Sequence, residues 1–168
     1  AAKCGDVLSL CALIKAKAAV DVRDNDNRTP LHYAAQNGHS AAVQVLVQSN
    51  ADVGAVDASH MTPVFLAAQK GHLVAVKVLI DAKASVAFAC DGWTPLHSAA
   101  HHGYKAIVQM LINAKANLDG GKDSFQTPLY LAAQNGHLGA VNVLINAKAA
   151  LRTQPVFDPL HGAAENGH

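Results

Sequence analysis

The chain has 168 residues, of which 51% are hydrophobic and 5% aromatic, and its formal net charge is +1 at pH 7. This balance gives no whole-molecule attraction to nucleic acid or to an anionic membrane, so we expect no nucleic-acid partner. No run of about 18 apolar residues is present, which predicts no direct membrane insertion. Three cysteines, an odd number without metal-ligand spacing, predict reduced thiols in a reducing, cytoplasmic compartment. They are Cys4, Cys11 and Cys90.

One phrase recurs four times along the chain at a nearly constant interval. It starts at Thr29, Thr62, Thr94 and Thr127, so that successive copies are 33, 32 and 33 residues apart. Each copy reads Thr-Pro and an apolar residue, and a pair of alanines and a glycine follow in the same register. A fixed period of this length indicates stacked units, each too small to bury its own apolar face alone.

Within each copy the residue types predict two short helices. The threonine can accept a backbone hydrogen bond as an N-cap, and proline fits the first helical position because its missing N–H costs nothing there. In the first copy we expect a helix over residues 31–36 that ends before Gly38, where a left-handed backbone suits glycine. A second helix follows, with apolar residues such as Val43 and Leu46 at helical spacing.

This phrase at this period closely resembles the ankyrin repeat. The resemblance implies an all-α solenoid of stacked helix-turn-helix units joined by hairpin-like loops, with about ten short helices. We expect a single domain over residues 1–168, made of a half repeat (1–23), four repeats (24–56, 57–88, 89–121, 122–152) and a partial repeat (153–168). Because the last helix would leave Leu160 and Ala163 poorly covered, we expect a segment of a longer array.

Ten histidines raise the question of a metal or catalytic site. Seven of them recur because the repeat recurs, so we predict structural roles for them. They are His32, His39, His72, His97, His137, His161 and His168. The adjacent His101 and His102 would point about 100° apart on a helix, which does not suit chelation of one ion. With no phosphate-binding loop and no local nucleophile motif, we expect no enzyme activity, no cofactor and no metal.

One position departs from the family pattern. Where the family usually has glycine after the second helix, this chain has Lys17, Lys83, Lys115 and Lys148, with Asn50 in the remaining copy. If this position is left-handed, lysine is strained there, whereas asparagine is tolerable. We favour the interpretation that these lysines, at the C-termini of the second helices, offset the helix macrodipole. The alternative is a basic ridge that binds a partner.

The resemblance implies that a protein partner binds the concave face formed by the hairpin loops and the first helices. The loop candidates are Asn25, Asp26, Arg28, Ala58, Ser59, Met61, Cys90, Asp91, Trp93, Asp123, Ser124 and Gln126. The first-helix candidates are Gln36, Asn37, Gln69, Lys70, His101, His102, Gln134 and Asn135. The only tryptophan, Trp93, is either an interface anchor or a ring folded over its own loop.

We expect most of the binding energy at the centre of this surface, around Met61, Lys70, Trp93, His101 and His102. The predicted function is therefore non-enzymatic protein binding by a monomeric module. Two alternatives remain. The chain is an accessory segment of a larger enzyme, channel or secreted effector, or it is an engineered ankyrin-type binder. Irregular loops and the lysine-for-glycine changes speak against a strict designed consensus.

Overall fold

The computed structural model describes residues 1–88, 90–120, 126–151 and 158–168. In these ranges the chain forms ten α-helices and the short 3₁₀ helix η1 (Ala2–Cys4). The same ranges contain no β-strand, and their one isolated bridge joins Cys90 and Trp93. The predicted all-α architecture is confirmed. The chain divides into two compact units, Ala1–Ser85 (unit 1) and Val86–His168 (unit 2).

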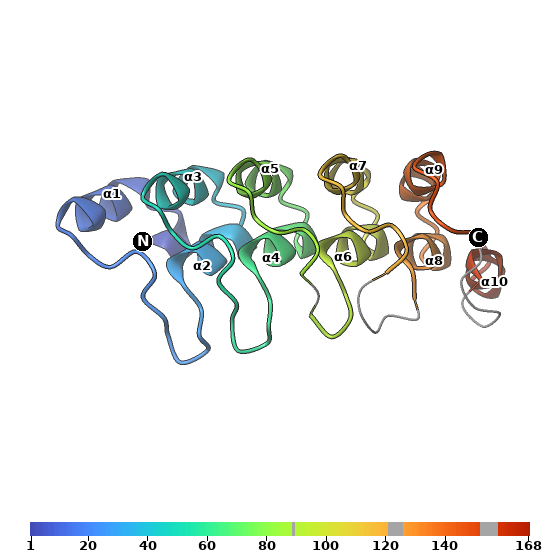
Figure 1. The fold of residues 1–168 in the computed structure, drawn as a ribbon, viewed down its shortest axis with the longest axis horizontal. Helices are drawn as coiled ribbons and strands as arrows, with labels where there is room; N and C mark the ends of the chain where they lie inside the picture. Colours follow the sequence, from blue (N-terminus) through green and yellow to red (C-terminus); the bar gives the residue numbers. More distant parts are fainter. Residues whose placement is uncertain (89, 121–125, 152–157) are drawn as a thin grey trace. The chain divides into compact units, whose positions relative to one another are not determined.

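Unit 1 consists of two layers of helices (Figure 1). One layer contains η1 and the first helices of two repeats, α2 (Pro30–Gln36) and α4 (Pro63–Gln69). The other contains the second helices, α1 (Val7–Lys15), α3 (Ser40–Gln48) and α5 (Leu73–Asp81). Helix α2 packs against η1 and α4, and α3 packs against α1 and α5. The loops before α2 and α4 extend from the first-helix layer, on the side away from α3 and α5 (Figure 1).

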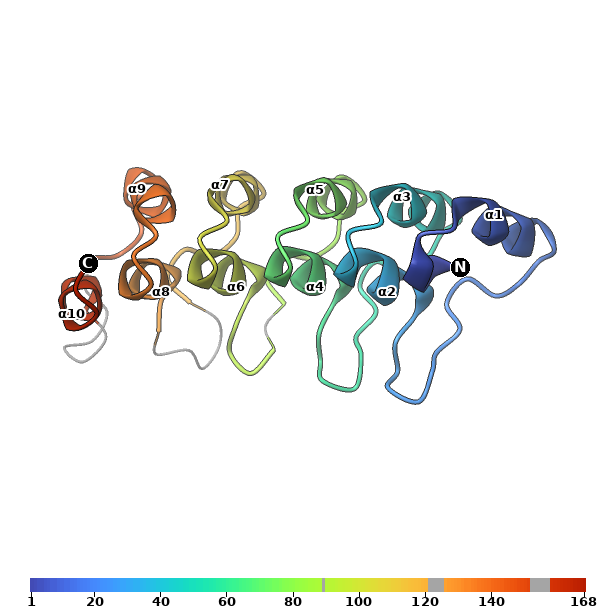
Figure 2. The same cartoon turned by 180° about the vertical axis from the view of Figure 1, so that it is seen from behind.

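Unit 2 repeats this arrangement, and Figure 2 shows it from behind. Its first helices are α6 (Pro95–His101), α8 (Pro128–Gln134) and α10 (Pro159–Glu165), and its second helices are α7 (Lys105–Asn113) and α9 (Leu138–Asn146). Helix α8 packs against both α6 and α10, and α7 packs against α9.

The predicted N-caps are confirmed. Thr62 Oγ1 accepts the backbone N–H of Phe65 at 3.3 Å, and Thr127 makes the equivalent contact with Tyr130 at 3.1 Å. In α2 the histidine of the phrase adds to the cap, because His32 Nδ1 accepts the backbone N–H of Thr29 at 3.1 Å. His97 does the same for Thr94 in α6, at 3.2 Å.

Three other repeated histidines join neighbouring repeats within each unit. The Nε2 atoms of His39 and His72 each lie 3.1 Å from a backbone carbonyl oxygen of the preceding repeat, at Lys3 and Gln36. In unit 2, His137 Nε2 makes this contact with the His101 carbonyl at 3.0 Å. A carbonyl only accepts, so each of these nitrogens carries the proton. These histidines have the structural role that the sequence predicts.

The position after the second helix is left-handed in every copy. Lys17, Lys83, Lys115 and Lys148 have φ between 61° and 68°, and Asn50 has φ 61°. Because the backbone is left-handed there, the sequence analysis predicts strain at these lysines. A lysine Cβ in this conformation crowds the following carbonyl oxygen, which costs about 1 kcal/mol per site.

The apolar residue after the capping proline is buried in α2, α4, α6 and α8 but exposed in α10. Leu96 and Leu129 are 0% and 1% exposed, whereas Leu160 is 77% exposed. The expectation that Leu160 is poorly covered is confirmed, and Ala163 is half-buried. Leu160 lines an apolar groove of about 630 Å³ together with Leu138 and Ile145 of α9.

Candidate protein-binding surface

The loop before α2 is ordered by the carboxylate of Asp24. Asp24 Oδ1 accepts the backbone N–H groups of Asp26 and Arg28, both at 2.9 Å, and its Oδ2 accepts the hydroxyl of Tyr33 at 2.5 Å. An aspartate that binds amides two and four residues ahead closes a turn and lets the intervening side chains point outward. The Tyr33 hydroxyl is the main cause of a lowered pKa at Asp24, since its hydrogen bond stabilises the carboxylate.

The loop before α4 is built in the same way around Asp57. Its Oδ1 accepts the backbone N–H groups of Ser59 and Met61, both at 2.9 Å. Asp57 is only 3% exposed, unlike Asp24, which lies at the surface. A buried carboxylate needs a charged or hydrogen-bonding partner for each oxygen. The two backbone amides satisfy one oxygen, and Arg28 binds the other.

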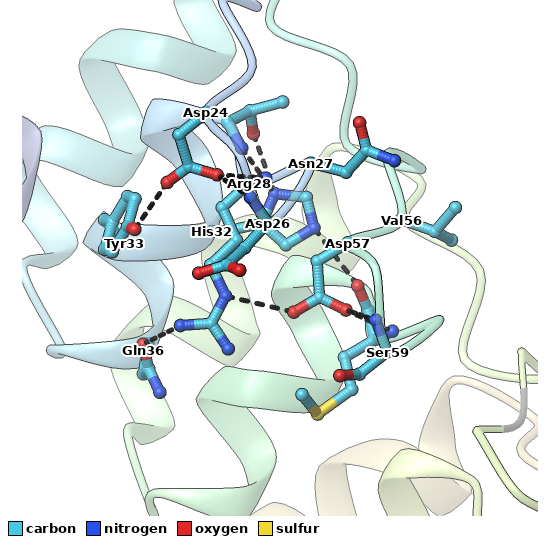
Figure 3. Close-up of polar contacts among 12 residues, drawn as sticks. Asp24, Asp26, Asn27, Arg28, His32, Tyr33, Gln36, Val56, Asp57 and Ser59 are labelled. Atoms are coloured by element: carbon cyan, nitrogen blue, oxygen red, sulfur yellow. Dashed lines mark hydrogen bonds and ion pairs between the residues drawn. The ribbon is translucent and has the colours of Figure 1, made fainter.

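Arg28 links the two loops of unit 1 (Figure 3). Its Nε lies 3.1 Å from Asp57 Oδ2, and the side chains are 21% and 1% exposed. Its Nη1 donates to Gln36 Oε1 at 3.3 Å, and the guanidinium lies over the Tyr33 ring, 5.9 Å from the centroid. One side chain thus connects the first loop, the second loop and the C-terminal end of α2.

Two further contacts hold the loops of unit 1 side by side. The backbone N–H of Ala58 donates to the carbonyl of Asp26 at 2.8 Å, which joins the two loop tips. Arg23 Nη1 donates to the carbonyl of Val56 at 2.9 Å. The candidates Asp26 and Ala58, which are 32 positions apart in sequence, therefore lie next to each other.

The other predicted site residues of unit 1 lie at the surface. Asn25, Asp26, Asn37, Ala58, Ser59 and Lys70 are exposed, and Arg28, Gln36, Met61 and Gln69 are half-buried. Asn37 Nδ2 donates to the Tyr33 carbonyl at 2.8 Å, so this side chain also closes the end of α2. Arg28 and Gln36 likewise have structural contacts in addition to the binding role that the sequence predicts for them.

The loop before α6 is organised by its backbone. Cys90 and Trp93 exchange two N–H···O hydrogen bonds, both 2.8 Å long, across the turn that contains the exposed Asp91. Trp93 is half-buried, and its ring meets the His101 ring edge-on with centroids 5.3 Å apart. The ring also lies 6.3 Å from that of His97. Trp93 therefore packs over the first helix of its own repeat, whereas the packing interpretation of the sequence placed the ring over its own loop.

The rings continue beyond Trp93 along the C-terminal end of α6. His102 is exposed, and its ring meets His101 edge-on at 4.9 Å and stacks on Tyr104 at 5.7 Å with an interplanar angle of 7°. Asn135, at the end of α8, places Nδ2 3.2 Å from His101 Nδ1. Four aromatic side chains of one repeat thus form a continuous strip, which we call the ring strip: Trp93, His101, His102 and Tyr104.

The remaining candidates are Gln126, Gln134, Asp123 and Ser124. Gln126 and Gln134 are half-buried, and Gln134 Nε2 donates to the Tyr130 hydroxyl at 3.3 Å. Asp123 and Ser124 lie outside the described residues. The predicted centre of binding combines residues of both units, and it stays a prediction.

Asp24, Asp57 and Tyr33 are organising residues that sequence reasoning missed. An aspartate five positions before the capping threonine in the first two copies was the available signal.

Burial keeps the capping histidines neutral. It lowers the pKa of His97 from 6.5 to about 4, and the adjacent backbone of Gln126 opposes part of this shift. Burial also lowers the pKa of His32, against the opposing effects of the Met61 backbone and Asp57. Both rings are 0% exposed. They are therefore neutral hydrogen-bonding groups of the core near pH 7 and are inaccessible to a substrate.

Three further features of the described ranges bear on their chemistry. No group of three or more His, Cys, Asp or Glu side chains there is arranged to hold a metal ion. None of the helices in those ranges is both long and apolar enough to cross a bilayer. All three cysteines are described, and none of them forms a disulfide.

The chain was compared with known proteins. The family model for three-copy ankyrin repeats matches residues 1–57 and 49–121, and the single ankyrin-repeat model matches residues 125–154. The crystal structure of the human ASB11 ankyrin repeat domain matches with a TM-score of 0.91 and 28% sequence identity, over 99% of this chain and 76% of that one. No curated protein matches significantly. Ankyrin repeats are generally protein–protein interaction modules and typically lack enzymatic activity. With family models covering most of its length, this chain belongs to the ankyrin repeat family.

Proposed function

We propose that this chain is a non-enzymatic module that binds a protein partner through its hairpin loops and first helices. The observation that carries the proposal is the Arg28–Asp57 contact, which holds two neighbouring loops of unit 1 together. Side chains at the loop tips, such as Asn25 and Asp26, remain exposed above this network. Loops that are ordered before binding lose less conformational entropy when a partner docks.

Unit 2 supports the proposal with the ring strip. Trp93 is half-buried, so its position is fixed by packing on His101 while part of its surface remains accessible. Tryptophan is enriched among interface hot spots because one rigid ring buries a large area at low entropy cost. We therefore assign Trp93 as the main anchor of the partner.

The test is affinity capture with the whole chain, followed by titration of variants with the captured partner. Trp93→Ala is expected to weaken affinity by about 2 kcal/mol or more, as truncation of a central aromatic anchor commonly does. Lys148→Ala, at an exposed left-handed position after α9, is the control and should cost little. Circular dichroism first shows that both variants fold. Loss of binding in Lys148→Ala, with Trp93→Ala intact, would place recognition on the basic ridge instead.

A matched pair of double variants tests the loops of unit 1. Asn25→Ala with Asp26→Ala removes two exposed loop-tip side chains, and Gln44→Ala with Gln48→Ala removes two exposed side chains of α3. We expect the loop pair to lower affinity and the helix pair to leave it unchanged. The opposite ranking would move the binding surface to the second helices.

A further inference from the structure

Asn135 determines which nitrogen of His101 carries the proton. The Nδ2 atom of Asn135 lies 2.8 Å from the Leu131 carbonyl oxygen, which can only accept, so this atom is the amide nitrogen. Asn37 and Asn166 make the same contact four residues back in α2 and α10. The same amide nitrogen lies 3.2 Å from His101 Nδ1. His101 Nδ1 therefore accepts, and the neutral ring carries its proton on Nε2.

Protonation of His101 is incompatible with this contact. A proton on Nδ1 would place N–H opposite N–H, so either the ring moves or the Asn135 amide turns and loses the Leu131 carbonyl. The neighbouring helices offer no compensating carboxylate, because α6, α7, α8 and α9 contain neither Asp nor Glu. The loop that carries Trp93 contains Asp91, which is exposed and does not contribute to the pKa shift of His101. Helix α7 contributes the cation Lys105, and α8 contributes only Tyr130. Burial, followed by the charges of His102 and His137, lowers the pKa of His101.

His101 lies where a change of charge is transmitted to the ring strip. Its ring contacts Trp93 on one side, at 5.3 Å, and His102 on another, at 4.9 Å. Its backbone carbonyl accepts the proton of His137 Nε2. The equivalent residues of the other complete copies are Gln36, Gln69 and Gln134, which do not titrate. Among the four complete copies, this one alone has an ionisable group at this position.

We infer that His101 is a pH-sensitive contact between α6 and α8 that controls the arrangement of the ring strip. The neutral ring holds Trp93 and Asn135 as described, and the protonated ring separates from Asn135 and rearranges Trp93. The functional consequence rests on the proposed function: a partner that docks on Trp93 binds less tightly in mildly acidic solution than at neutral pH.

The experiment needs no partner, because Trp93 is the only tryptophan and its fluorescence reports on this contact. Emission of the whole chain is titrated from neutral to mildly acidic pH, with circular dichroism recorded at each point. We expect a loss of emission while helicity is unchanged, with a midpoint below 6.5, the ordinary pKa of histidine. His101→Gln, which installs the residue of the other copies, should remove this transition. An identical transition in His101→Gln, or one that coincides with loss of helicity, overturns the inference.

A second variant tests the partner of the contact. Asn135→Asp places a carboxylate opposite His101 Nδ1, which favours the protonated ring and should raise the midpoint by about one pH unit or more. An unchanged midpoint would contradict the inference. Failure of either titration leaves the proposed binding function untouched. Conversely, full affinity in Trp93→Ala would overturn the binding assignment without affecting the titration.

Discussion

Gln36 in unit 1 and His101 in unit 2 occupy the same position, two residues before the glycine that ends the first helix. Their backbone carbonyls have the same role, since each accepts a hydrogen bond from a histidine of the next repeat. Their side chains differ. Gln36 accepts from Arg28 and joins a network of charged groups, whereas His101 contacts Trp93 and Asn135. The repeat determines the backbone contact at this position. The identity of the side chain determines which neighbouring side chains it contacts.

The loops of the two units differ in a corresponding way. In unit 1, Asp24 and Asp57 bind backbone amides of their own loops, and Arg28 joins the loops to each other. The next two copies have Ala89 and Lys122 at the aspartate position, and neither residue type can accept a hydrogen bond through its side chain. Unit 1 therefore presents a loop surface held by the Arg28–Asp57 ion pair and hydrogen bonds, and unit 2 presents one built from aromatic rings.

The largest expected effect is on the network of unit 1. Asp57→Ala removes a buried carboxylate that binds two amides and Arg28, and it should lower the free energy of unfolding by about 3 kcal/mol. Urea denaturation measures this change. Asp24→Ala should have a smaller effect because that carboxylate is exposed to water. The exposed Asp26→Ala is the control. If Asp57→Ala is no more destabilising than Asp26→Ala, the network does not hold the loops.

Acid is expected to destabilise unit 2 more than unit 1. The pKa of His97 is about 4 in the folded chain and 6.5 in the unfolded chain, so the unfolded chain binds more protons between these values. The free energy of unfolding is therefore full above about pH 6.5 and falls by about 2 kcal/mol at about pH 5. In unit 1, Asp57 and the Met61 backbone oppose the same shift at His32.

Urea denaturation at about pH 7.5 and pH 5 tests this expectation. Amide hydrogen exchange at the two pH values then assigns the loss to the residues of each unit. Equal stability at both pH values, or a loss confined to unit 1, would contradict the lowered pKa of His97 in the folded chain.

The smallest expected effect concerns the left-handed residues. Lys83→Gly relieves the strain of a side chain at φ 67° and should raise the free energy of unfolding by about 0.5 kcal/mol. Part of the gain is offset by lost interaction with the helix dipole. Asn50→Gly at φ 61° should change stability less, because asparagine tolerates this conformation. A loss of stability in Lys83→Gly would favour a specific contact of the lysine over the strain account.

The repeated residues predicted most of the fold. The Thr-Pro phrase gave the correct start of α2, α4, α6 and α8, because proline at the first helical position marks a start in sequence alone. The position where lysine replaces glycine is left-handed, which is the condition under which the sequence predicts strain. These are local effects, and each depends on a few residues in a row.

The organisation of the candidate surface was less accessible from the sequence. The contact of Arg28 with Asp57 spans 29 positions, and that of Asn135 with His101 spans 34. Burial of an aspartate runs against its usual preference for water, so the sequence gives no reason to expect Asp57 to be buried. Trp93 was left with two interpretations because only the packing on His101 shows where its ring lies.

The central claim is that the loops and first helices form the partner surface. The most direct measurement is backbone hydrogen exchange of the whole chain with and without the captured partner. We predict slower exchange in residues 24–29, 57–62 and 90–94 and at the ends of the first helices, with α3, α5 and α7 unchanged. Protection confined to α3, α5 and α7, or to the turns at Lys17, Lys83, Lys115 and Lys148, would contradict the account.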